Sequence, residues 1–151
     1  MARLRDLRAA LETTSALKLA KVDKDILPDV ISNHIAIHNA VKKEEEDLET
    51  ARKGFMKGLD ERFEEYNKLA QKINYSEPAE QRSILRTLDV DYTDVVEAGN
   101  KIKQYRDDIE SKDISVEIKP INRAKYLDSL KAANPDYTVK DIINVEFMLS
   151  E

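Results

Sequence analysis

Hydrophobic residues follow a helical period along most of this chain. Near the start, Leu4, Leu7 and Leu11 recur three and four residues apart, which places them on one face of a helix with the arginines outside it. We therefore predict an N-terminal helical segment over residues 1–24. An amphipathic helix of this length gains most of its stability from burying its apolar face, so the segment should pack on another element.

A second, longer helical segment is predicted over residues 28–74. Pro28 suits the first turn of a helix, and the next proline is Pro78. The segment carries a seven-residue spacing in two rows, as in a coiled coil. The first row is His34, Val41, Leu48 and Phe55, and the second is His38, Glu45, Arg52, Leu59, Tyr66 and Ile73. Gly54 and Gly58 mark a weak point or bend in this arm, because glycine disfavours a helix interior.

The chain is then predicted to turn back through helices over residues 76–112. Ser76 and Thr93 are candidate helix caps, and Val95, Ile102 and Ile109 repeat with a spacing that suits antiparallel packing on the arm. The pattern thus predicts a long helical hairpin. It fits pairing within one chain and pairing between chains equally well.

The period changes at residues 113–120, "DISVEIKP". Ile114, Val116 and Ile118 alternate with polar residues, as in a half-buried strand that ends at Pro120. The nearest partner with the same alternation is residues 88–92, so we predict a two-stranded ribbon between these segments. If they do not pair, the open strand edge invites a strand from another protein.

Two short helices are predicted to close the chain within residues 113–151. Asn122 is a candidate cap of the first, and Thr138 with Asp141 resembles a capping box before the second. The whole pattern predicts a mostly α fold in a single domain of residues 1–151. It consists of a long, coiled-coil-like antiparallel hairpin, short accessory helices and a minor two-stranded β-ribbon.

Composition and charge narrow the classes of function. The chain has no cysteine, which excludes disulfides and thiolate ligands, and no apolar run long enough to predict a signal peptide or a membrane span. These features fit the cytoplasm. The net charge of −5 disfavours contact with phosphate backbones. Direct binding to nucleic acid is therefore not expected, although residues 1–24 are locally basic.

The two histidines are the first candidates for chemistry. His34 and His38 are four residues apart and could chelate a metal ion, but Ile35 stands where a hydrolytic zinc motif needs glutamate. Glu45 on the same stripe is too far away to complete a site. We therefore expect no metal, and histidines that face the helix packing and are satisfied by hydrogen bonds. Motifs for catalysis or cofactor binding are missing too, so we predict neither an enzyme nor a cofactor.

Two groups of side chains are candidates for protein interaction. The apolar group is Phe55, Leu59, Phe63 and Tyr66, and the acidic group is Glu44, Glu45, Glu46, Asp47 and Glu49. The acidic group has two interpretations. It is either a solvated helix face with ion pairs four residues apart, or a row of carboxylates that resembles nucleic-acid phosphate to a basic partner.

The order of these parts resembles a family of small uncharacterised proteins encoded by tailed bacteriophages and prophages. The resemblance is carried by "ALKLAKVDKDILPDVI", "DISVEIKPI" and "YTVKDIINVEFML", with Leu27, Pro28 and residues 116–120 and 142–149 as the matching positions. Residues 74–92 depart from the pattern, because a helical insert stands where a shorter loop is expected. The family has no assigned activity, so the resemblance implies no catalytic residues.

The resemblance implies phage origin and therefore two kinds of role, both without catalysis. The first is a virion-associated or assembly component, located in the host cytoplasm or the virion, which binds a phage structural or assembly protein or a further copy of itself. The second is an inhibitor of a host nuclease or defence complex, which binds a basic host protein through the acidic helical surface. The first predicts association with little dependence on salt, and the second predicts binding that salt weakens.

Overall fold

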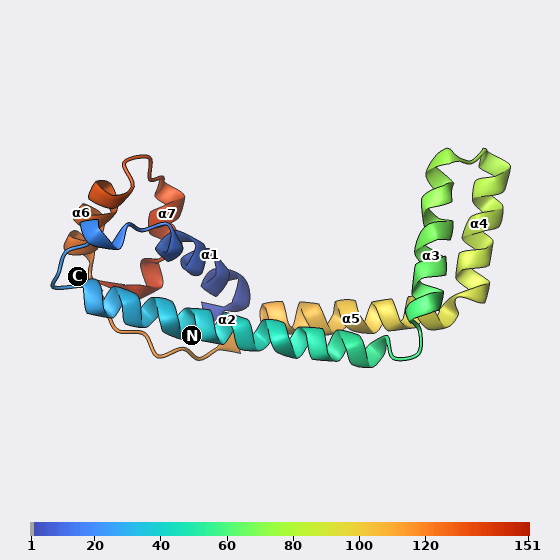
Figure 1. Cartoon of the computed structure of the whole chain (residues 1–151), viewed down its shortest axis with the longest axis horizontal. Coiled ribbons are helices and arrows are strands. Elements are labelled where there is room, and N and C mark those ends of the chain that lie inside the picture. The colour runs from blue at the N-terminus through green and yellow to red at the C-terminus, as the bar shows by residue number, and fades with distance from the viewer. Residues whose placement is uncertain (1) are drawn as a thin grey trace. The chain divides into compact units, whose positions relative to one another are not determined.

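The computed structural model describes residues 2–151 and confirms a mostly α-helical fold (Figure 1). The helices are α1 (Leu4–Ser15), α2 (Leu27–Phe55), α3 (Asp60–Lys72), α4 (Pro78–Asp91), α5 (Thr93–Ser111), α6 (Arg123–Ala133) and α7 (Val139–Ile143). Short 3-10 turns occur at Leu19–Lys21, Ile73–Tyr75 and Glu146–Met148. The strands are β1 (Ala2–Arg3), β2 (Asp113–Ile114), β3 (Ile121–Asn122) and β4 (Leu149–Ser150).

The chain divides into two compact units. Unit 1 comprises Met1–Glu45 and Ile109–Glu151, and unit 2 comprises Glu46–Asp108. Helices α2 and α5 each contribute residues to both units. The single domain of residues 1–151 stays a prediction, and it requires that the two units unfold together.

The core of unit 1 forms around α1 and α2. Leu4 and Leu7 are completely buried, as the N-terminal stripe predicts, and Ile37 of α2 is buried with them. The N-terminal helix is shorter than predicted, however, because α1 ends at Ser15. After the 3-10 turn, the main-chain N–H of Asp23 donates to the Ser129 hydroxyl of α6 at 2.9 Å. This tertiary contact holds the connection to α2 in a non-helical path.

The predicted ribbon between residues 88–92 and 114–118 is wrong. Residues 88–91 belong to α4, where Leu88 and Ile84 are buried one helical turn apart and Val90 is exposed. The strands pair with distant partners instead. β2 is antiparallel to β1, with Ala2 opposite Ile114, and β3 is parallel to β4, with Ile121 opposite Leu149.

Only the start of the predicted strand at residues 114–118 is a strand, and a side chain holds the rest. Asn33 of α2 is completely buried. Its Nδ2 donates to the Lys119 carbonyl, and the Lys119 N–H donates to its Oδ1, both at 2.8 Å. The amide group thus satisfies both main-chain groups of Lys119, much as a neighbouring strand does.

The predicted continuous helix over residues 28–74 is also wrong, because α2 ends at Phe55 and α3 begins at Asp60. Between them, Gly58 has φ +78°, a left-handed conformation that side chains other than glycine rarely adopt. The weak point expected at Gly54 and Gly58 is therefore a complete break. The returning helix is present as α5, and α3 and α4 form an additional hairpin in which the two helices lie side by side (Figure 1).

Two of the predicted helix caps are confirmed. Asn122 Oδ1 accepts from the Lys125 N–H at 3.0 Å, and Asp141 Oδ2 accepts from the Thr138 N–H at 2.8 Å. The prediction for Ser76 is wrong, because its hydroxyl donates back to the Lys72 carbonyl at 2.6 Å and the position before α4 is taken by Glu77.

Candidate protein-interaction site

The break after α2 creates the candidate site in unit 2. The turn is closed by main-chain hydrogen bonds from Met56 to Arg52 at 3.0 Å and from Leu59 to Met56 at 2.8 Å. Asp60 and Glu61 then occupy the first turn of α3, where negative charge favours the helix dipole. The new helix therefore begins at a sequence that suits a helix N-terminus, and its apolar residues take a new direction.

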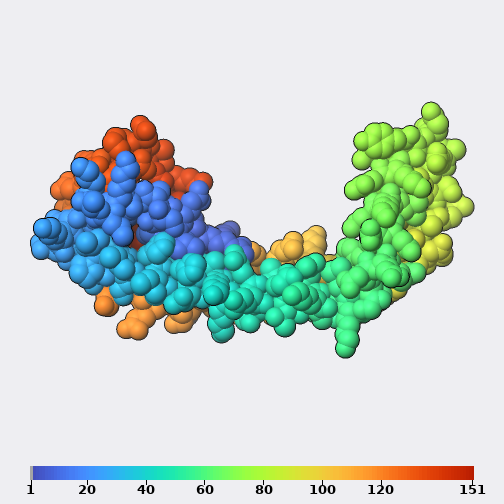
Figure 2. Space-filling view, in the orientation of Figure 1, coloured from blue at the N-terminus to red at the C-terminus, as the bar shows by residue number. Residues whose placement is uncertain are grey.

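Helix α3 has an apolar side that the structure does not bury. None of its 13 residues is buried, although Phe63, Tyr66 and Leu69 recur at helical spacing and are partly covered. The neighbouring helices do bury apolar residues, which are Ile84 and Leu88 of α4 and Val95 of α5. In Figure 2, no other element of unit 2 covers the visible face of the α3 and α4 hairpin. The apolar side of α3 is thus incompletely enclosed.

A groove of about 520 Å³ lies along α3 within unit 2. Its lining residues come from α2, the following turn, α3 and α5: Arg52, Met56, Asp60, Phe63, Glu64, Asn67, Gly99 and Ile102. A Cβ added at Gly99 would meet no heavy atom within 4 Å, so the groove is open at this point. Apolar side chains lie beside charged and amide groups, as where the apolar core of a protein interface meets its polar rim.

Arg62 fixes the end of the hairpin nearest α5. Its Nε donates to Asp94 Oδ2 at 2.8 Å and its Nη2 to Asp94 Oδ1 at 2.9 Å, and this hydrogen bonding lowers the pKa of Asp94. The guanidinium also lies 4.9 Å from the ring centre of Tyr92, which in turn packs edge-on against Tyr66 at 5.9 Å. These contacts fix the position of α3 relative to α5.

The four apolar candidates all lie in unit 2, and two of them pack against other aromatic residues of this unit. Phe55 ends α2 and packs edge-on against Tyr105 of α5, with ring centres 6.3 Å apart. Leu59 lies in the turn before α3, Phe63 lines the groove, and Tyr66 contacts Tyr92. The structure therefore distributes these residues over the end of α2, the turn and α3, and only Phe63 lines the groove.

The acidic candidates do not form one exposed row. Glu44 is only 5% exposed, and its carboxylate lies 2.9 Å from the Lys112 ammonium. Glu45 pairs with Arg8 at 3.2 Å, and Glu49 pairs with Arg52 at 2.8 Å. Glu46 and Asp47 are exposed on α2. Much of this acidic charge is thus balanced within the chain.

The histidines lie where α1 meets α2 in unit 1. His34 Nδ1 is hydrogen-bonded to Thr14 Oγ1 at 2.7 Å, which confirms its predicted structural role. Burial, and secondarily the charge of His38, lowers the pKa of His34. His38 is exposed, contrary to expectation, because Ile37 takes the buried position on this turn of α2.

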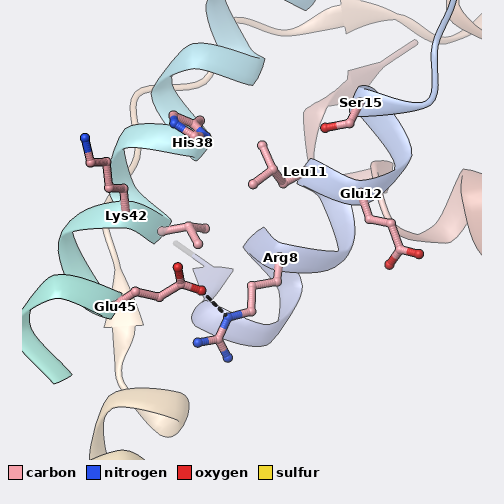
Figure 3. Close-up of a pocket in the computed structure, with 8 residues that line it drawn as sticks. Arg8, Leu11, Glu12, Ser15, His38, Lys42 and Glu45 are labelled. Atoms are coloured by element: carbon pink, nitrogen blue, oxygen red, sulfur yellow. Dashed lines mark hydrogen bonds and ion pairs between the residues drawn. The ribbon is translucent and has the colours of Figure 1, made fainter. Parts of the chain in front are cut away.

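His38 borders a second pocket, of about 360 Å³, between α1 and α2 (Figure 3). In the figure, Arg8 extends from α1 to Glu45 of α2, and Leu11 points between the two helices. Arg8 also pairs with Glu110 of α5. Since its charged residues include both signs and the arginine already has two carboxylate partners, this pocket offers no single-sign site for an ion.

Residues 2–151 contain neither a group of metal ligands nor a membrane-spanning helix. Within residues 2–151, no three histidine, cysteine, aspartate or glutamate side chains are grouped so that they could hold a metal ion. In the same part of the chain, no helix combines the length and the apolar character that crossing a membrane requires.

No family model, no curated protein and no solved structure matches this chain. The groove along α3 is the feature that sequence reasoning missed. Its signal was present in "GFMKG", since a glycine after an apolar helical stretch commonly ends a helix in the left-handed conformation. The prediction of a bend kept Leu59 and Tyr66 in one continuous helix with Phe55.

Proposed function

We propose that this chain acts by binding protein, as a virion-associated or assembly component of a tailed bacteriophage. Phage origin is supported by the resemblance of its motifs to a family of phage and prophage proteins. Binding as the mode of action is supported by one observation above all, the incompletely buried apolar side of α3 and the groove beside it. Apolar surface of this kind is stabilised when a partner covers it.

The ion pairs of the acidic group favour this role over inhibition of a host protein. An acidic mimic of nucleic acid needs carboxylates that are available to a basic partner. Here Glu44 is buried beside Lys112, and Glu45 and Glu49 each pair with an arginine of the chain. Glu46 and Asp47 are exposed, but two carboxylates make a short row, so the apolar surface around Phe63 is the better-supported binding surface.

The test is affinity capture with two matched baits. Phe63→Asp places a charge in the groove, and Val139→Asp places the same charge at an exposed position of α7 in unit 1. We expect the wild type and Val139→Asp to capture the same phage protein from infected cells, in low and in high salt, and Phe63→Asp to lose it.

Two results would contradict the proposal. One is capture of a basic host protein from uninfected cells that is released by salt, which would support the inhibitor role. The other is equal capture by all three baits, which would show that the partner does not bind in the groove. Circular dichroism of each variant confirms that a loss of binding is not a loss of fold.

A further inference from the structure

We propose that two copies of this chain associate through their α3 and α4 hairpins, side by side and in opposite directions, to form a four-helix bundle. The inference goes beyond the proposed function, because it concerns a second copy of the chain and does not depend on a phage partner. It rests on the exposure of apolar residues in the hairpin and on the distribution of its charges.

The first observation is that the hairpin has apolar side chains which two helices do not enclose. On α3, Tyr66 and Leu69 are partly exposed, and on α4, Leu85 is 49% exposed. Four helices around a shared core are the common solution for such stripes. A second hairpin would cover these residues and give them a complete core.

This surface is distinct from the groove that contains Phe63. Phe63 and Leu69 are six residues apart on α3, which places them about 120° apart around the helix axis at 100° per residue. Leu69 and Leu85 do not line the groove. A second copy on the hairpin would therefore leave the Phe63 groove available to another partner.

The second observation is that charge is segregated along the hairpin. We define its base as residues 60–66 and 87–91 and its tip as residues 67–86. The base has six carboxylates and one arginine, a net charge of −5: Asp60, Glu61, Glu64, Glu65, Asp89 and Asp91 against Arg62. The tip has four cations and two carboxylates, a net charge of +2: Lys68, Lys72, Arg82 and Arg86 against Glu77 and Glu80.

This segregation selects the second copy as the occupant and sets its direction. Two hairpins in the same direction would place one acidic base beside the other, which is unfavourable. In opposite directions, the basic tip of each copy lies beside the acidic base of the other. Each contact is then formed twice around a twofold axis, as in most protein dimers. Because exposed ion pairs contribute little energy, the charges set the direction and the apolar residues supply the affinity.

The ion pair already present within α3 does not prevent this arrangement. Lys68 and Glu64 are 3.2 Å apart, but their side chains are 71% and 69% exposed. Five further charged residues are exposed as well: Glu61, Lys72, Arg86, Asp89 and Asp91. These five residues provide charge changes at the base and at the tip, on both helices.

The experiment measures mass in solution by light scattering for two charge-reversed proteins, alone and mixed. The tip variant carries Lys72→Glu and Arg86→Glu, which takes the net charge of the tip from +2 to −2. The base variant carries Glu61→Lys, Asp89→Lys and Asp91→Lys, which takes the net charge of the base from −5 to +1. Alone, each would place like charges together, so we expect at least about a tenfold weaker dimer than for the wild type. Mixed in equal amounts, the acidic tip of one meets the basic base of the other. We expect a heterodimer with an affinity near that of the wild type.

A control variant tests whether the position of the charge changes matters, rather than the net charge of the protein. Lys21→Glu with Lys140→Glu changes the net charge as the tip variant does, but at exposed positions of unit 1, and should leave the dimer unchanged. The proposal is overturned by a wild type that is monomeric at about 100 μM, where a specific dimer should be populated. It is equally overturned if each variant dimerises normally, or if the mixture restores nothing although both proteins keep their helical spectrum.

The dimer and the proposed function fail in different ways. Loss of phage-protein capture with an intact dimer would contradict the function alone. A monomer that still captures a phage protein through Phe63 would contradict the dimer alone.

Discussion

Gly58 is the residue that separates α2 from α3, because it alone among the three glycines has a positive φ, of 78°. An alanine in this left-handed conformation costs about 1–2 kcal/mol. We therefore expect Gly58→Ala to lower the free energy of unfolding by about 1 kcal/mol or more. The matched variant is Gly99→Ala, inside α5, where an added Cβ meets no atom within 4 Å.

Gly99→Ala should have the opposite effect and stabilise the protein by about 0.5–1 kcal/mol, because alanine favours a helix interior. Urea denaturation followed by circular dichroism measures both changes. Equal effects of the two substitutions would show that the conformation of Gly58 does not determine the break.

His34 links stability to pH at the scale of one side chain. Burial lowers its pKa in the folded protein below the ordinary value of 6.5. The unfolded chain therefore binds a proton at higher pH than the folded chain does, so stability rises with pH through this range. This contribution is fully present above pH 6.5 and is lost as the pH falls from 6.5 toward the lowered pKa of the folded state.

We expect the midpoint of urea unfolding to fall between pH 7 and pH 5, and to fall less in His34→Gln, which cannot be protonated. His38→Gln removes only the secondary cause of the pKa shift and should have a smaller effect. An identical pH dependence in the wild type and His34→Gln would refute this account.

At the scale of elements, Asn33 replaces a strand partner for residues 115–120. Asn33→Leu would remove both hydrogen bonds to the main chain of Lys119, and each such bond contributes about 0.5–1.5 kcal/mol. We therefore expect a loss of about 1–3 kcal/mol in the free energy of unfolding, and faster hydrogen exchange of the Lys119 amide. Asn39→Leu, at an exposed position of the same helix, removes no such pair and should lose little; a loss equal to that of Asn33→Leu would contradict the pairing.

The elements also show which parts of the fold could be predicted from sequence. The stripe of Leu4 and Leu7 and the cap at Asn122 were predictable, because the signals for both lie within a few residues. The partner of β2 was not, since Ala2 and Ile114 are far apart in sequence and many registers fit two residues. Residues 88–92 show that alternation over five residues does not distinguish a strand from a helix whose opposite face is exposed.

The candidate site, too, could be predicted only where the signal is local in sequence. The types of the apolar residues were predictable, and Phe63 and Tyr66 do contribute to the surface around α3. Their direction was not, because one left-handed residue at Gly58 reorients every side chain that follows it. The burial of Glu44 depends on Lys112, which is distant in sequence, so the acidic run alone could not reveal it.

At the scale of the whole molecule, the two units differ in how much apolar surface they bury. Of the 22 buried apolar residues within residues 2–151, only Ile84, Leu88, Val95, Ala98 and Ile102 lie in unit 2. Regions with few buried apolar contacts open at lower free energy than the rest of a protein. We therefore expect main-chain amides of α3 and α4 to exchange with solvent faster than those of α1 and of α2 before Glu46.

The proposed dimer adds a dependence on protein concentration to the expected amide exchange of α3 and α4. If a second copy covers α3 and α4, their exchange should slow as protein concentration rises through the dissociation constant, while exchange in unit 1 stays constant, because association stabilises only the state in which it occurs. Hydrogen exchange by mass spectrometry at two concentrations measures this directly. Equal protection in both units at every concentration would mean that residues 2–151 open as one cooperative domain, and that the hairpin is stabilised by the rest of the chain rather than by a partner.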